Sequence, residues 1–297
     1  MQTLESVKRQ ISTTKDLHSI VKTMKALAAV NIRQLERAVE SLVDYNRTIE
    51  LGFRVLLSRH PETGLSARDA PRNTLGTVVF GSDQGMCGPL NDQITAYAIG
   101  KMNHTEISSD ERRVLAVGVR TAARLEDAGQ VVEATHPVPS STAGITPMVQ
   151  QVLLHIERWH SSQGIDRVVL YYCEHQSRAS YAPKSVDLLP IDHDWLKNIQ
   201  TQRWPTHVLP MVTMQPTELF SDLVRQYLFV SLYRAFAESL ASENASRLSS
   251  MTGAERNISD RITALTTQFH HQRQMTITEE LLDIAAGFEA LSDTSRL

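Results

Sequence analysis

Residues 219–269 read LFSDLVRQYLFVSLYRAFAESLASENASRLSSMTGAERNISDRITALTTQF, without a proline and with one glycine, Gly253. Large apolar residues recur through this stretch at spacings of three and four, or at sums of these steps, which is the period of a coiled-coil seam. The seam positions are Leu219, Leu223, Leu228, Leu232, Phe236, Leu240, Leu248, Met251, Ile258, Ile262, Leu265 and Phe269. Helices of globular domains usually run about 8 to 20 residues. The stretch therefore predicts one very long helix rather than an ordinary core helix.

The N-terminal part of the chain has a second stripe of the same period. Its positions are Leu4, Val7, Ile11, Leu17, Val21, Ala28, Ile32, Leu35, Val39, Leu42, Ile49, Phe53 and Leu56. All 11 prolines of the 297-residue chain lie between Pro61 and Pro216. Proline costs about 3 kcal/mol inside a helix, so long helices are possible only at the two ends. We predict three segments, which are an N-terminal coiled-coil helix (1–60), a central domain (61–216) and a C-terminal coiled-coil helix (217–297).

Each stripe needs an apolar partner, and the simplest partner is the other stripe in an antiparallel pair. If both helices start at the central domain, Leu4 lies level with about Gln272, and Leu35 lies level with Leu240. Residues 275–291 then outrun the N-terminal helix and have no partner within the chain. Their apolar members are Ile277, Leu281, Leu282, Ile284, Ala285, Ala286, Phe288 and Leu291. An exposed apolar tip of this length implies a binding sleeve in another protein.

The central segment changes from the helical period to alternating short apolar runs and helical stretches. The runs at 77–80, 113–117 and 167–172 predict buried strands, with a further strand at 186–190, and the stretches at 90–102, 121–128 and 147–160 predict helices. Strands that alternate with helices are typical of a parallel sheet. The predicted fold class is α/β, a doubly wound, Rossmann-like domain combined with a long antiparallel two-helix coiled coil.

Composition excludes several function classes. The formal net charge is −3 and the pI about 6.4, which gives no case for nucleic-acid binding. Cys87 and Cys173, the only cysteines, form neither a CxxC pair nor a zinc-type spacing. No apolar run approaches the roughly 18 residues of a membrane span. The N-terminus shows no targeting signal. We expect a cytosolic protein that docks on a membrane complex without inserting into the bilayer, and we expect no cofactor.

The loop at 81–88 is the first place to look for an active site, because it follows a strand and precedes a helix. It lacks the GxGxxG order and the GK[ST] ending that bind phosphates, so nucleotide binding is not expected. Cys87 suits a small structural residue better than a reactive thiol. His270 and His271 are adjacent on a helix and point about 100° apart, so they cannot share a metal. Residues 192–194 are interpreted as a solvated turn in a loop. No catalytic or metal-binding set is predicted.

Four motifs stand in order along the chain. They are RQI at 9–11 with IVKTM at 20–24, SDQGMCGPLN at 82–91, SENASR at 242–247, and RQMTITEEL at 273–281. Over essentially the whole chain they resemble the γ subunits of F-type ATP synthases, whose motifs read RxxI…ITKAM, SDRGLCGGLN, SExxAR and RQxxITQEL. The departures are Asn31 in place of a lysine, Gln84 of an arginine, Pro89 of a glycine and Phe288 of an alanine. They indicate a divergent branch, such as the bacterial alternative or sodium-pumping ATPases.

The resemblance implies a non-catalytic central rotor shaft that couples ion flow through a membrane c-ring to ATP synthesis or hydrolysis in an α3β3 ring. Its partners would be the α and β subunits, the ε subunit and the c-ring, at the cytoplasmic face of the bacterial inner membrane. Whether protons or sodium ions are moved stays open. So does the main direction of the reaction.

The resemblance also implies candidates for contact between rotor and stator, namely Met24, Cys87, Arg247, Gln274 and Thr278. Met24 fits a seam residue equally well, and Arg247 has the alternative of a solvated surface arginine. Gln274 and Thr278 are four apart and so share one helix face.

Two other classes of function remain as alternatives. One is an enzyme with a doubly wound domain and helical arms, which would bind a nucleotide on its own. The other is a coiled-coil scaffold or tether, which would form homodimers through its stripe.

Overall fold

The computed structural model describes residues 3–61, 74–105, 107–177, 180–205, 208 and 210–294. The chain forms two compact units, one made of residues 1–27 and 250–297 and the other of residues 28–249. The elements are α1 (Leu4–Arg59), β1 (Leu75–Phe80), α2 (Leu90–Asn103), β2 (Arg112–Val117), α3 (Val119–Asp127), β3 (Val132–His136), α4 (Ile145–Arg158), β4 (Arg167–Ser177), β5 (Ser180–Leu189), α5 (His193–Thr201) and α6 (Pro216–Thr294). The helices at both ends are as long as the proline distribution predicts.

The unit of residues 28–249 is built on a five-stranded sheet in the order β3-β2-β1-β4-β5. The first four strands are parallel, with Val79 paired to Ala116 on one side and to Tyr171 on the other, and β5 runs antiparallel to β4. The doubly wound sheet is therefore confirmed, with an antiparallel edge strand added. β3 was not predicted. It is a short edge strand whose residues alternate between half-buried and exposed, so it has no continuous apolar run.

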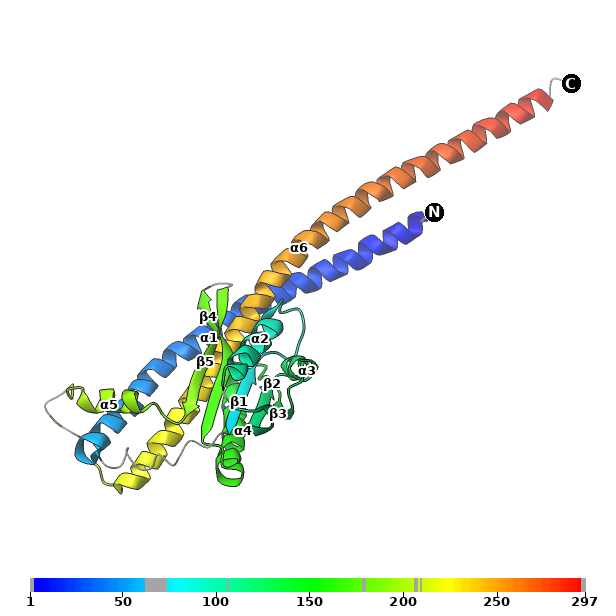
Figure 1. Ribbon diagram of the computed structural model, residues 1–297. Coiled ribbons are helices and arrows are strands. Elements are labelled where there is room, and N and C mark those ends of the chain that lie inside the picture. Colours follow the sequence, from blue (N-terminus) through cyan, green and yellow to red (C-terminus); the bar gives the residue numbers. More distant parts are fainter. Residues whose placement is uncertain are drawn as a thin grey trace. The chain divides into compact units, whose positions relative to one another are not determined.

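Both faces of the sheet are covered. One core lies under α2 and α3, where Leu90, Ile94 and Leu125 are fully buried. On the other face α4 packs with parts of α1 and α6 (Figure 1). There Phe80 of β1 meets Phe236 of α6 edge to face, with ring centroids 4.9 Å apart. A strand buried on both faces reads as a continuous apolar run, which is why β1, β2 and β4 were predicted from the sequence.

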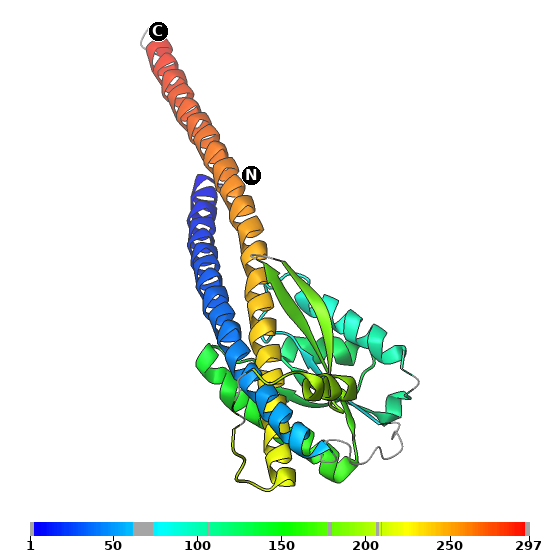
Figure 2. The same cartoon turned by 90° about the vertical axis from the view of Figure 1, so that its left-hand side faces the viewer.

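Within this unit α1 and α6 lie side by side and antiparallel (Figure 2). Asn31 donates to Asn244 at 3.4 Å, and the Tyr45 hydroxyl donates to Gln226 at 2.7 Å. A Cβ added at Gly52 would lie 2.7 Å from the Leu223 side chain. Gly52 lies as many residues after Asn31 on α1 as Leu223 lies before Asn244 on α6, as an antiparallel pair in constant register requires. The predicted antiparallel pairing is confirmed, with the register that places Leu35 beside Leu240.

The unit of residues 1–27 and 250–297 contains one segment of each long helix. Lys25 pairs with Glu255 at 2.7 Å across the two segments, and Val7 and Leu265 are buried at 0% and 2% exposure. The α6 segment continues beyond the level at which α1 begins. Its side chains there are open to solvent, with Leu281 62% and Ile284 69% exposed. The predicted overhang is confirmed through residue 286, and the Phe288 and Leu291 side chains lie outside the described residues.

The interpretation of residues 192–194 as a turn in a loop is wrong. Asp192 is the N-cap of α5, and its carboxylate accepts from the Asp194 N–H at 2.9 Å. Leu196 and Ile199 of α5 pack against Ile49, Phe53 and Val230 in a third core. α5 has nine residues and buries only Leu196 and Ile199. A helix this short with so few apolar residues is hard to distinguish from a loop in the sequence.

In the part of the chain that the structure describes, no helix combines the length and apolar character of a membrane span.

α1 ends at Arg59 and α6 begins at Pro216. The division of the chain into segments 1–60, 61–216 and 217–297 stays a prediction.

Candidate functional site

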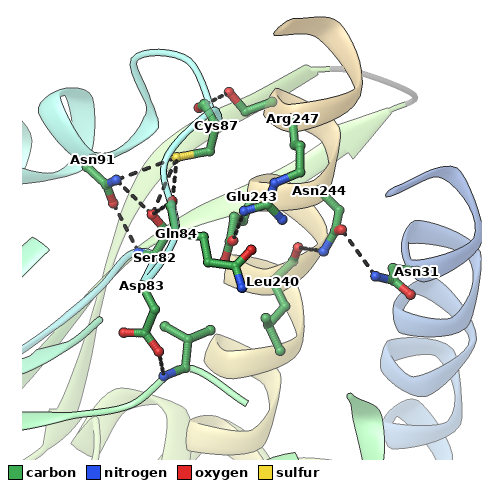
Figure 3. Close-up of polar contacts among 12 residues, drawn as sticks. Asn31, Ser82, Asp83, Gln84, Cys87, Asn91, Leu240, Glu243, Asn244 and Arg247 are labelled. Atoms are coloured by element: carbon green, nitrogen blue, oxygen red, sulfur yellow. Dashed lines mark hydrogen bonds and ion pairs between the residues drawn. The ribbon is translucent and has the colours of Figure 1, made fainter. Parts of the chain in front are cut away.

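The loop after β1 is folded around its own polar side chains. Asn91 accepts from the Ser82 N–H at 3.0 Å and donates to the Ser82 hydroxyl at 2.8 Å, and that hydroxyl bonds the Gln84 carbonyl at 2.9 Å (Figure 3). The Cys87 sulfur lies 3.4 Å from the Ser82 hydroxyl and is part of a side chain with 2% exposure. The burial of Cys87 agrees with its interpretation as a small structural residue rather than a reactive thiol. Sequence reasoning missed Met86, which stands at positive φ and is 61% exposed at the surface of the loop.

Asp83 ties this loop to two neighbouring segments. One carboxylate oxygen accepts from the Val119 N–H at the start of α3, and the other accepts from the Val138 N–H after β3, each at 2.8 Å. An added Cβ at Gly118, where φ is +111°, would lie 2.7 Å from the Ser82 carbonyl oxygen, so the two loops touch through backbone. Asp83 therefore holds together the carboxyl ends of three parallel strands.

This edge of the sheet is where open α/β folds bind their ligands. A phosphate needs backbone N–H donors at the start of the helix after β1. That helix, α2, follows Pro89, which has no N–H, and the Leu90 N–H points to the Cys87 carbonyl at 3.4 Å. The Asp83 carboxylate adds a negative charge at the same edge. The arrangement opposes phosphate binding.

Glu243 and Arg247 form a buried ion pair one helical turn apart on α6. The Arg247 guanidinium donates to Glu243 at 2.6 Å, and the two side chains are 12% and 7% exposed. Burial raises the pKa of Glu243, and Arg247 opposes that rise. One oxygen of Glu243 and Nε of Arg247 have no hydrogen-bond partner among the residues that the structure describes. The alternative of a solvated surface arginine is therefore wrong for Arg247.

The structure groups the five candidate residues into two sets. Cys87 and Arg247 belong to the unit of residues 28–249, where the Ser246 hydroxyl, next to Arg247, donates to the Cys87 carbonyl. Met24, Gln274 and Thr278 belong to the other unit.

In that second set the surroundings differ. Met24 is half-buried, as a seam residue would be, whereas Gln274 and Thr278 are exposed. The Thr278 hydroxyl donates to the Gln274 carbonyl within the helix at 2.8 Å, so the Gln274 amide is the freer of the two polar groups. Contact of any of the five with a partner protein stays a prediction.

Metal-binding side chains form no set of metal ligands in the part of the chain that the structure describes. Across the described ranges, no three His, Cys, Asp or Glu side chains are grouped so that they could hold a metal ion. A small cavity between α1, α6 and residues 139–142 is lined by uncharged groups, among them Asn31, Leu35, Leu240 and Asn244.

Known proteins resemble the chain over nearly its whole length. The family model "ATP synthase" matches residues 3–291. The ATP synthase gamma chain of Buchnera aphidicola subsp. Diuraphis noxia is 25% identical over 98% of this chain and 99% of its own length. The gamma chain of Heliobacterium modesticaldum is 26% identical over 98% of this chain and all of its own.

Solved structures share the fold. A chain in the Euglena gracilis mitochondrial ATP synthase, in a structure of OSCP, F1 and the c-ring, superposes with a TM-score of 0.65 at 17% identity, covering 99% of this chain and 96% of its own. A chain of the central stalk and c-ring structure from Tetrahymena thermophila gives 0.55 at 22% identity, covering 79% of this chain and 99% of its own.

Proposed function

The chain belongs to the ATP synthase family of gamma chains, and we propose that it is the central rotor shaft of a rotary F-type ATP synthase. In this role it couples ion flow through a membrane c-ring to ATP synthesis or hydrolysis in an α3β3 ring. The observation that carries the proposal is the α6 overhang, because exposed apolar side chains such as Leu281 and Ile284 continue past the start of α1. A receiving sleeve in a partner would bury them.

The paired helices suit a shaft better than a tether. A tether that dimerises through its seam must leave the seam free in the single chain. Here Leu35 and Leu240 are 4% and 8% exposed, since each helix uses the other as its partner. Two packed helices also resist bending and twisting more than one does.

Coupling follows from the asymmetry of such a shaft. A two-helix shaft presents different faces to three equivalent β subunits, so it stabilises a different state in each. The coupling free energy between shaft angle and nucleotide affinity is reciprocal. Hydrolysis can therefore turn the shaft, and a shaft turned from the membrane can release ATP.

The assignment of partners rests on the family and on the likeness of fold. We propose that α6 beyond residue 275, together with Met24, Gln274 and Thr278, faces the α3β3 ring. Cys87, next to exposed Met86, and Arg247 belong to the unit of residues 28–249, which we also assign to contacts with the stator. The ε subunit and the c-ring bind the central domain, for which we retain the boundaries 61–216. The chain is peripheral at the cytoplasmic face of a bacterial inner membrane.

We further propose that the subunit has no active site of its own. Asp83 and Pro89 oppose phosphate binding at the edge of the sheet where a doubly wound enzyme would hold a nucleotide. The catalytic groups then belong to the partner subunits.

Rotation tests the proposal directly. The full chain, carrying a surface tag for a bead, is assembled with the α and β subunits of the same organism on a glass surface. We expect ATP to drive stepwise rotation of the bead in one direction. The control is a complex that lacks the chain, which should show no directed rotation. A chain that purifies as a homodimer and does not assemble with α and β would refute the shaft.

A further inference from the structure

One segment of α6 is enclosed on all sides. Every residue from 235 to 246 is buried, which we call the enclosed segment. A helix that lies on a domain surface exposes one face to solvent. The enclosed segment instead includes the buried polar residues Ser239, Ser242, Glu243, Asn244 and Ser246.

Side chains of the enclosed segment bond the backbone of other elements. The Ser242 hydroxyl donates to the Cys173 carbonyl of β4 at 2.7 Å. One turn further on, the Ser246 hydroxyl donates to the Cys87 carbonyl in the loop after β1 and lies 3.2 Å from the Tyr181 hydroxyl of β5. Because they are four residues apart, Ser242 and Ser246 share one face of the helix.

The opposite face is also held. Asn244 is two residues from Ser242, about 200° around a helix with 3.6 residues per turn. It accepts from Asn31 of α1 at 3.4 Å (Figure 3). The enclosed segment is thus bonded to the sheet on one side and to α1 on the other.

Small residues and internal ion pairs allow this enclosure. Ala235, Ala237, Ala241 and Ala245 let the surrounding elements approach the helix closely, and all four are at most 2% exposed. The Glu238 carboxylate is paired with Arg234 at 2.6 Å, as Glu243 is with Arg247. The buried carboxylates are thus paired within α6, which leaves the serine hydroxyls to bond the sheet.

We propose that the enclosed segment is where torque passes between α6 and the sheet domain, with Ser242 and Ser246 as the positioning residues. The inference rests on the proposed shaft function. Turning α6 about its axis against the sheet would break both serine bonds and strain the Asn31–Asn244 contact. Directional hydrogen bonds on opposite faces add to the resistance that the close-packed side chains around α6 already offer to this rotation.

The test uses the assembled ATP synthase carrying the double variant Ser242→Ala and Ser246→Ala. Alanine is the best helix former, so α6 itself should persist. Loss of two buried bonds should make opening of the enclosed segment about tenfold more frequent, measured as amide hydrogen exchange of residues 235–246. The matched control is Ser239→Ala, since Ser239 is equally buried but makes neither bond.

Coupling is the decisive readout. In membrane vesicles we expect ATP hydrolysis by the double variant to stay near that of the wild type, while ions pumped per ATP fall measurably, because the weakened contact lets α6 slip against the sheet. If exchange accelerates but pumping per ATP is unchanged, or if Ser239→Ala lowers it equally, the proposal is wrong. If the double variant does not assemble, each single variant is measured, and normal coupling in both also refutes it. A wild-type chain that fails to assemble with α and β would instead refute the shaft function itself.

Discussion

Leu35 of α1 and Leu240 of α6 belong to the same buried core and line the same small cavity. Their proximity fixes the antiparallel register of the two long helices in the unit of residues 28–249. Contacts on either side, from Asn31 to Asn244 and from Gly52 to Leu223, follow the same register.

Cysteines at this pair should therefore crosslink within one chain. The variant Leu35→Cys, Leu240→Cys, oxidised at low protein concentration, should give a monomer of increased mobility on a non-reducing gel. The native Cys87 and Cys173 are buried and free, so the single variants are the controls for unwanted bridges. Exclusively intermolecular crosslinks would show that the helices pair between chains.

The isolated chain should not bind ATP. The sequence of the loop at 81–88 contains no lysine, and the loop offers the Asp83 carboxylate, whose oxygens already accept two backbone N–H groups. Calorimetric titration with MgATP should show no heat beyond dilution. Micromolar binding would revive the enzyme alternative.

Stability should fall in weak acid because of two histidines on β3 and α4. Burial lowers the pKa of both His136 and His155 below 6.5, and their rings lie 6.0 Å apart with Arg158 nearby, while Glu133 contacts His155 at 3.3 Å and opposes its shift. The unfolded chain therefore binds protons first as the pH falls through 6.5, and the folded state loses stability from there down to the lower pKa values of the folded protein. Well above pH 6.5, where the imidazoles are neutral in both the folded and the unfolded chain, the two groups contribute no pH dependence.

Urea unfolding at pH 7.5, 6.5 and 5.5 measures this effect. The double variant His136→Gln, His155→Gln should show a smaller drop in the free energy of unfolding between pH 6.5 and 5.5 than the wild type does. Equal drops would mean that other groups, such as the carboxylates, set the pH dependence.

Helix continuity should matter for coupling. Ala264 is an exposed position inside α6. The variant Ala264→Pro removes one helical hydrogen bond and costs about 3 kcal/mol or more. We expect the assembled complex to hydrolyse ATP but to pump few ions per ATP, whereas the control Ala264→Ser should pump normally. Normal pumping by the proline variant would argue against a stiff helix as the coupling element.

The large features of the fold were predictable because they depend on local properties of the chain. Proline confined to the middle and a sustained apolar period predict α1 and α6, and continuous apolar runs predict the buried strands. β3 and α5 were missed, since an edge strand with half-buried residues and a short capped helix leave weak patterns.

The burial of the enclosed segment, residues 235–246, could not be predicted from the sequence. Ser242, Glu243 and Asn244 are polar residues between seam positions, and a helical pattern places such residues in solvent. They are buried because β4, the loop after β1 and α1 surround them, and these contacts join residues far apart in the sequence. Asp83 was part of a recognised motif, but its bonds to Val119 and Val138 depend on the order of strands in the sheet.

The overhang of α6, residues 275–291, should matter for assembly and not for the stability of the isolated chain. Ile284, the first residue of the deletion below, is 69% exposed, and Leu281 and Leu282 just before it are 62% and 63% exposed, so apolar side chains at this tip contribute little to the stability of the isolated chain. Burial in a sleeve would contribute several kcal/mol, at about 25 cal/mol per Å² of apolar surface. Deleting residues 284–297 should therefore leave the melting temperature of the isolated chain unchanged within about 2 °C. The same deletion should weaken assembly with the α3β3 ring or the pumping that the complex supports.

A matched control separates loss of apolar surface from loss of length. Replacing Leu281, Leu282 and Ile284 by Gln keeps helix-forming side chains of similar size and removes the apolar surface. If a sleeve buries these side chains, this variant should impair assembly or pumping as the deletion does, again with an unchanged melting temperature. A large drop in the melting temperature of either isolated variant would show that the tip packs on its own chain, and the antiparallel register with an unpartnered end would then be wrong.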